Sequence, residues 1–95
     1  MELQSNMIKR FLDDNGRLKQ FPAKAAVRMQ VLAYLHTKFE KGRKYTEKEV
    51  NSIISQWITF GDYFIVRRSL VDNGLLARTS NGSEYWKIET PEIGR

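Results

Sequence analysis

Apolar residues recur at intervals of three and four positions in four segments of the chain, which is the spacing of one buried face of an α-helix. This spacing predicts helices over 2–13, 24–39, 46–58 and 62–73. Phe64 is expected to flank the inward face of the last helix. The residues that we expect to face inward are Leu3, Met7, Ile8, Phe11, Leu12, Val27, Val31, Leu32, Tyr34, Leu35, Phe39, Val50, Ile53, Ile54, Trp57, Ile58, Val66 and Leu70.

Capping residues mark the ends of the last two predicted helices. Thr46 followed three residues later by Glu49 is a capping-box pattern, in which each side chain bonds the backbone N–H of the other residue. Thr59 or Asp62 starts the following helix, and residues 73–74, Asn-Gly, predict a left-handed cap at its C-terminal end.

Short extended segments separate or follow these helices. Residues 17–21 lie between Gly and Pro and predict a short edge strand or an extended arm. We expect residues 40–45 to form a loop in which residues 43–45 could pair briefly as a strand. The runs 75–79 and 84–88 predict a β-hairpin, because the Asn-Gly pair at 81–82 favours a tight turn.

The order of these elements indicates the fold class. From residue 24 onward the chain reads helix, short strand, helix, helix and hairpin, which is the order of a winged helix. We therefore predict one α+β domain, a winged helix-turn-helix with an N-terminal helix and a short extended arm. Residues 1–23 form the helix and arm, 24–88 the winged-helix core, and 89–95 a tail. A chain of 95 residues has room for one modest core.

The charge of the chain is unevenly distributed. The net charge is +5, but residues 1–45 hold ten Lys and Arg against four Asp and Glu, whereas residues 46–95 hold six against seven. A basic chain favours nucleic acid as a partner, and the near-neutral second half weakens that interpretation. The lack of cysteine, of a secretory signal and of an apolar run long enough for a membrane span leads us to expect a cytoplasmic protein.

The leading functional hypothesis is DNA binding. The helix 62–73 would enter the major groove, and the hairpin 75–88 would contact the neighbouring backbone. Arginine suits this role because its planar guanidinium makes two hydrogen bonds to guanine or clamps a phosphate. We expect Arg67 to project outward, one position past the inward Val66. The candidate contacts to double-stranded DNA are Tyr63, Arg67, Arg68, Arg78, Thr79, Ser80, Asn81, Ser83, Arg43, Lys44 and Thr46.

The alternative hypothesis is a non-catalytic protein-interaction or dimerisation module on the same scaffold. The chain has 12% aromatic residues, and an exposed aromatic beside an amphipathic N-terminal helix would suit a homodimer or a partner regulator. We expect no enzyme, metal or cofactor, because His36 is the only histidine and no cysteine or paired carboxylate accompanies it.

Four motifs in order carry a family resemblance. They are FPAK (21–24), YTEKEVN (45–51), VRRSLVDNGLL (66–76) and GSEYW (82–86). They resemble a bacterial family of domains of unknown function whose members occur alone or attached to ArsR-like winged-helix regulators and to acetyltransferases. The resemblance implies a winged-helix-like fold in a cytoplasmic protein linked with gene regulation. The run 66–78 also resembles the recognition helix of GntR-type and MarR-type regulators, which implies DNA contacts by Arg67 and Arg68.

Overall fold

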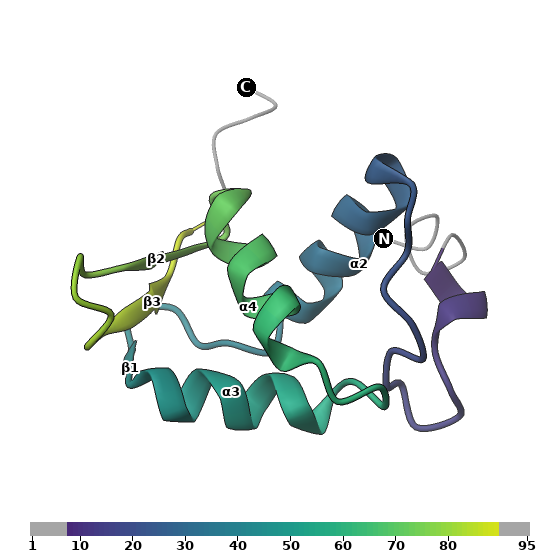
Figure 1. The fold of residues 1–95 in the computed structure, drawn as a ribbon, viewed down its shortest axis with the longest axis horizontal. Helices are drawn as coiled ribbons and strands as arrows, with labels where there is room; N and C mark the ends of the chain where they lie inside the picture. Colours follow the sequence, from purple (N-terminus) through teal and green to yellow (C-terminus); the bar gives the residue numbers. More distant parts are fainter. Residues whose placement is uncertain (1–7, 90–95) are drawn as a thin grey trace.

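The structure, a computed structural model, describes residues 8–89, which form three α-helices, one short 3₁₀ helix and a small antiparallel sheet (Figure 1). The sheet lies on one side of α4, and α2 and the N-terminal arm lie on the other side (Figure 1). In chain order the elements are η1 (Lys9–Phe11), α2 (Ala25–His36), β1 (Lys44–Tyr45), α3 (Glu47–Gln56), α4 (Tyr63–Asp72), β2 (Leu76–Arg78) and β3 (Tyr85–Lys87).

Local side-chain caps fix the starts of α3 and α4. The Thr46 hydroxyl accepts the Glu49 N–H at 3.1 Å, and the Glu49 carboxylate accepts the Thr46 N–H at 2.8 Å. The predicted capping box is therefore confirmed. Helix α4 starts after Asp62, whose carboxylate accepts the Ile65 N–H at 3.2 Å. Each cap satisfies a backbone N–H that has no partner inside the helix.

Helix α2 ends three residues earlier than the spacing of apolar residues predicts. After His36 the chain tightens, and the N–H groups of Thr37, Lys38 and Phe39 bond to carbonyls three residues back rather than four. The Phe39 side chain nevertheless remains buried. The apolar ridge thus continues past the end of the regular helix, which explains why the sequence overestimates its length.

The sheet has the strand order β1–β3–β2, and both pairings are antiparallel. The predicted hairpin is confirmed with shorter strands, Leu76–Arg78 and Tyr85–Lys87. Gly82 has a φ of 75°, a conformation that glycine adopts without steric cost. Three helices followed by a hairpin that joins a short first strand are compatible with a winged-helix layout.

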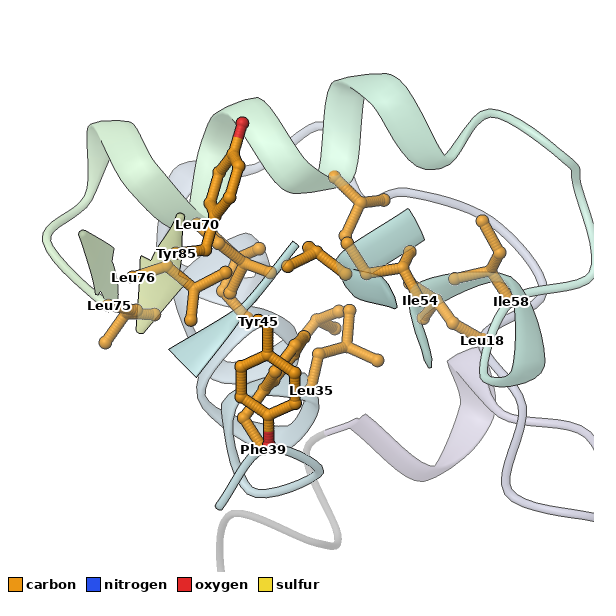
Figure 2. Packing of buried hydrophobic residues seen from close by; sticks show 14 of the residues in the cluster. Leu18, Leu35, Phe39, Tyr45, Ile54, Ile58, Leu70, Leu75, Leu76 and Tyr85 are labelled. Carbon is orange, nitrogen blue, oxygen red and sulfur yellow. The ribbon is translucent and has the colours of Figure 1, made fainter. Parts of the chain in front are cut away.

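A single cluster of apolar side chains fills the space between the helices and the sheet (Figure 2). Val66 and Leu70 of α4 are fully buried in it, as predicted. The cluster also includes Leu18 from the arm, which has no exposed surface. Helices α3 and α4 make close contact with each other, and α4 also packs on α2 and β2. The position of α4 is therefore set from three sides.

The prediction of a helix over residues 2–13 is wrong at its C-terminal end. Among the described residues of this segment, Ile8 and η1 are helical, whereas Leu12 is extended and pairs with Leu18. The turn at Asp13 reverses the chain, because its carboxylate accepts the N–H groups of Asn15 and Arg17 at 2.9 and 2.8 Å. The remainder of the predicted N-terminal helix, with Leu3 and Met7, lies outside the described residues.

Within the arm at residues 17–21, Leu18 is buried and pairs with both Leu12 and Ile58, so it does not form an edge strand, whereas Lys19 and Gln20 are exposed. The Leu18 N–H donates to the Trp57 carbonyl at 2.7 Å, and the Thr59 N–H donates to the Leu18 carbonyl at 2.9 Å. The arm thereby joins the connection between α3 and α4. No helix within residues 8–89 has the length and apolar character required to cross a membrane.

Candidate functional site

The first turn of α4 presents three consecutive large apolar side chains to solvent. Tyr63 is 37% exposed, Phe64 52% and Ile65 41%. Because Val66 and Leu70 occupy the inward face, the helical period turns Phe64 almost directly away from the core. The expectation that Phe64 only flanks the inward face is therefore wrong. The outward ridge of α4 runs from Phe64 through Arg68 to Asp72.

Arg67 is not free to project into solvent as expected, because its side chain is only 12% exposed. Its Nη1 atom donates to Oδ1 of Asn51 at 2.5 Å, and its Nη2 atom lies 3.6 Å from Oε2 of Glu47. The guanidinium also lies 5.1 Å from the centre of the Phe64 ring. Arg67, which follows Val66, faces the start of α3. Glu47 and Asn51 lie one turn apart on α3, and both contact the Arg67 side chain.

Tyr85 extends this polar network to the sheet. Its hydroxyl donates to Oε1 of Glu47 at 3.1 Å. Burial raises the pKa of Tyr85, and its hydrogen bond to the Glu47 carboxylate raises the pKa further. The phenol is therefore a stable donor. Glu47 thus connects α3 to α4 through Arg67 and to β3 through Tyr85.

A pocket of about 400 Å³ lies between α4 and the hairpin. Its charged lining consists of Glu47, Arg67, Arg68, Asp72 and Arg78. Phe64, Val71 and Tyr85 supply apolar and aromatic surface. None of residues 8–45 lines this pocket. Three of the predicted DNA-contacting arginines are therefore brought together, but the basic residues within 8–45 do not line the pocket with them.

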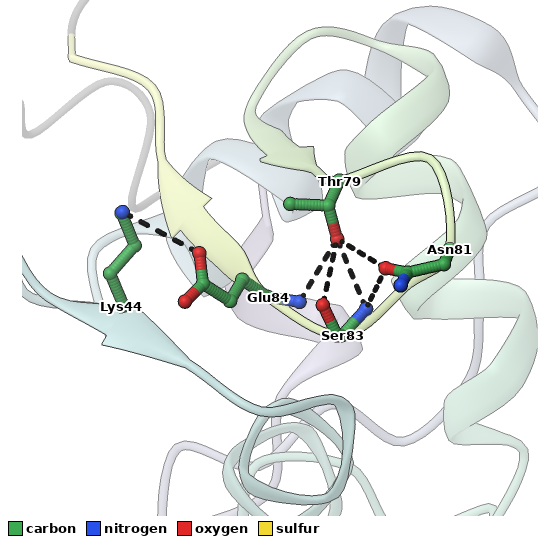
Figure 3. Close-up of polar contacts among 5 residues, drawn as sticks. All are labelled: Lys44, Thr79, Asn81, Ser83 and Glu84. Atoms are coloured by element: carbon green, nitrogen blue, oxygen red, sulfur yellow. Dashed lines mark hydrogen bonds and ion pairs between the residues drawn. The ribbon is translucent and has the colours of Figure 1, made fainter.

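The predicted contact residues at the tip of the hairpin bond mainly to each other (Figure 3). The Thr79 hydroxyl donates to Oδ1 of Asn81 at 3.0 Å and accepts the N–H groups of Ser83 and Glu84 at 3.0 and 3.2 Å. Ser80 is exposed at this tip. These side chains stabilise the loop that joins β2 and β3, in the manner typical of Thr and Asn in turns.

The remaining candidates lie around β1 and the start of α3. Lys44 approaches Glu84 of the hairpin at 3.6 Å (Figure 3), and Arg43 lies 3.8 Å from Glu40 and 4.0 Å from Glu49. The Thr46 hydroxyl is used by the helix cap. These residues therefore have protein partners of their own. Tyr63 lines a second depression, which also includes Glu47, Asn51 and Arg67.

No group of three or more His, Cys, Asp or Glu side chains lies close enough within residues 8–89 to hold a metal ion. The Nε2 atom of His36 lies 2.9 Å from the Ile88 carbonyl. Burial lowers the pKa of His36, so the ring favours the neutral form that donates to this carbonyl. This contact holds the end of α2 to the segment after β3.

Comparison with known families identifies the chain. A family described as "Uncharacterized protein conserved in bacteria (DUF2087)" matches residues 17–87. The chain belongs to this family. The match contains the whole pocket and the exposed turn of α4, whereas η1 and the turn at Asp13 precede it. Neither the curated proteins nor the solved structures that were compared include a match.

Three members of the site were not anticipated from the sequence. Glu47, Asn51 and Tyr85 form the polar network that occupies Arg67. The spacing of Glu47 and Asn51 by four residues was an available signal, because such a pair lies on one helix face. No local sequence pattern predicts the contact of Tyr85 with Glu47, because this contact depends on how the DUF2087 chain folds its hairpin against α3.

Proposed function

We propose that this domain is a non-catalytic protein-interaction module on a winged-helix scaffold, and that a partner protein docks on the outward face of α4. The observation that carries this proposal is the exposure of Tyr63, Phe64 and Ile65 in one helical turn. Exposure of apolar surface to water is unfavourable, at about 25 cal/mol per Å². Such patches mark binding sites, and aromatic residues are enriched at the centre of interfaces.

The electrostatics of α4 favour a protein partner over the DNA groove. Arg67 is held by Glu47 and Asn51. The helix starts after Asp62, which caps its first turn, and Asp72 at the end of the outward ridge pairs with Arg68, so the charges of α4 and its cap sum to zero and give little attraction to a phosphate backbone. An apolar turn between two aspartates suits a protein surface better than a nucleic acid.

A docking role also agrees with the resemblance of the sequence to domains that occur attached to ArsR-like regulators and acetyltransferases. A domain that is joined to proteins of different activities can serve each of them by binding a partner. The near-neutral charge of residues 46–95 agrees with the same role. The module would act in the cytoplasm of a bacterium.

DNA binding is the second candidate, and a specific observation favours it. Arg68 and Arg78 are exposed on opposite sides of the gap between α4 and the hairpin. In that role α4 would enter the major groove and the tip at 79–83 would contact the backbone. Arg68 would then make the contact to guanine or phosphate that was expected of Arg67.

A peptide selection tests the leading proposal. Twelve-residue peptides selected from a random phage-displayed library would be synthesised and titrated against the wild-type domain by fluorescence anisotropy. We expect Phe64→Ser to weaken binding at least tenfold, the effect of about 1.4 kcal/mol. Met29→Ser is the matched control, because Met29 is an exposed large apolar residue on α2, and it should change nothing.

Two results would overturn the proposal. The first is the absence of any peptide whose affinity depends on Phe64. The second is binding of a random duplex DNA with a steep salt dependence that the double variant Arg68→Gln, Arg78→Gln removes, because that result would assign the face to DNA.

A further inference from the structure

The pocket between α4 and the hairpin combines one unpaired positive charge with an apolar wall. Arg67 lies 3.6 Å from Glu47, and Arg68 lies 3.9 Å from Asp72. Arg78 makes no ion pair with any of residues 8–89. Three arginines and two carboxylates leave the lining with a net charge of +1.

The guanidinium of Arg78 lies close to the turn of the hairpin. A Cβ atom placed on Gly82 would lie 3.2 Å from Nη1 of Arg78 and 3.4 Å from Oε1 of Glu47. The guanidinium and the carboxylate therefore lie against the same turn. Arg78, at the end of β2, therefore brings its charge to the pocket from the hairpin, whereas Arg68 and Asp72 line it from α4.

The two charged pairs in the pocket differ in how easily a ligand could displace them. The side chains of Arg68 and Asp72 are 69% and 66% exposed, and such surface pairs contribute little. Arg67 is largely buried and also bonds Asn51. An incoming anion could therefore recruit Arg68, whereas Arg67 stays bound to α3.

We propose that this pocket binds the carboxylate of an acidic side chain of the partner, between Arg78 and Arg68, while an adjacent apolar side chain of the partner packs on Phe64 and Val71. The inference rests on the proposed function, because Phe64 belongs both to the pocket and to the exposed turn. The partner segment is thus an acidic one that carries a bulky apolar residue next to Asp or Glu.

The charge of the lining selects a carboxylate over a phosphorylated side chain. A phosphomonoester carries about −1.5 to −2 at pH 7, whereas a carboxylate carries −1 and matches the net +1 of the pocket. A guanidinium binds a carboxylate through two parallel hydrogen bonds. The net charge of +5 on the whole chain would also attract an acidic segment.

Small probes test this site separately from any partner. The ¹⁵N-labelled domain would be titrated with 3-phenylpropionate, with 3-phenylpropanol as its neutral counterpart and phenyl phosphate as the dianion. We expect saturable shifts of the Arg68 and Arg78 Nε–H signals with 3-phenylpropionate, and at least tenfold weaker binding of the alcohol. Arg78→Gln and Arg68→Gln should each weaken the carboxylate about tenfold. Lys41→Gln, at an exposed site outside the pocket, should have no effect.

The outcomes separate the two proposals. Equal binding of acid and alcohol, tighter binding of phenyl phosphate, equal shifts at all basic side chains, or no shifts would each overturn the carboxylate site. If selected peptides depend on Phe64 but not on Arg68 or Arg78, the docking role stands and the carboxylate site fails. If the carboxylate binds as expected but no peptide depends on Phe64, the docking role fails, and the pocket loses the partner inferred for it.

Discussion

At the scale of single residues, Arg67 and Arg68 are neighbours with opposite environments. The helical period turns consecutive side chains by about 100°, so Arg67 faces the start of α3 while Arg68 faces solvent. Arg67 has two polar partners and a ring beneath it, whereas Arg68 has one distant carboxylate. The two arginines therefore form a natural matched pair for mutation.

We expect Arg67→Met to lower the free energy of unfolding by about 1–3 kcal/mol, because Asn51 and Glu47 lose a charged hydrogen-bonding partner at a largely buried position. Arg68→Met should change it by no more than about 0.5 kcal/mol. Urea denaturation followed by circular dichroism measures both. Equal midpoints for the two variants would mean that the Arg67 network contributes nothing to the fold.

His36 makes stability depend on pH. Its pKa in the folded state is lowered, first by burial and then by the charge of Lys87, against the opposing effects of the Ile88 carbonyl and Glu89. The unfolded chain therefore binds a proton more readily. Stability is at its full value above the ordinary histidine pKa of about 6.5 and falls as the pH decreases below it, down to the folded pKa.

The measurement is the free energy of unfolding in urea at several pH values from about 7.5 to about 5.5, above the range of most carboxylates. The wild-type domain should lose stability over this range. His36→Gln keeps an N–H donor for the Ile88 carbonyl but cannot be protonated, so its stability should be nearly constant. A parallel decrease in both proteins would assign the pH dependence to other groups.

At the scale of elements, local sequence signals were sufficient to predict where α3 and α4 begin, but they did not predict the contacts of the arm. Thr46 and Glu49 predict the start of α3 because the cap and its partner are three residues apart. The C-terminal end of α3 depends on Arg17, which is nearly 40 residues distant in sequence. Its guanidinium donates to the carbonyls of Ser55 and Gln56 at 3.3 and 3.2 Å, and to Ile58 at 2.7 Å. No local pattern could have predicted that contact.

This contact predicts a specific role for Arg17. The last carbonyls of a helix have no partners within it, and a cation there also interacts favourably with the helix dipole. Arg17→Ala should therefore lower the free energy of unfolding by about 1–2 kcal/mol and increase amide exchange in the last turn of α3. Lys19→Ala, two residues along at an exposed position, is the control. Unchanged exchange in α3 would show that the guanidinium contacts do not hold the helix end.

At the scale of the whole molecule, the order of elements was predictable and the site was not. Hydrophobic spacing and turn residues are local properties, and they placed α2, α3, α4 and the hairpin in the correct order. The candidate site depends on which side of α4 meets Glu47 and Tyr85. Tertiary packing determines which side of α4 meets these residues. The sequence pattern therefore wrongly predicts that Arg67 points outward, and it does not predict that Phe64 is exposed.

The integrity of the whole molecule also depends on the arm, although the winged-helix order of elements does not include it. Leu18 has no exposed surface, and its backbone bonds both neighbours of Ile58. It thus links the arm, the connection between α3 and α4, and the core in one unit. The arm and the helices should therefore unfold together.

The variant Leu18→Ala tests whether the arm and the helices unfold together. Removal of a fully buried leucine side chain costs about 2–5 kcal/mol, so the free energy of unfolding should fall by that amount. Because the arm is paired with residues 57 and 59, native-state amide exchange at Leu18 and Thr59 should accelerate together with that of the core amides of α2. Lys19→Ala, on the exposed side of the same segment, should leave all of these rates unchanged. Faster exchange confined to the arm, with α2 as protected as before, would mean that the arm opens independently and that the core of the domain begins at residue 24.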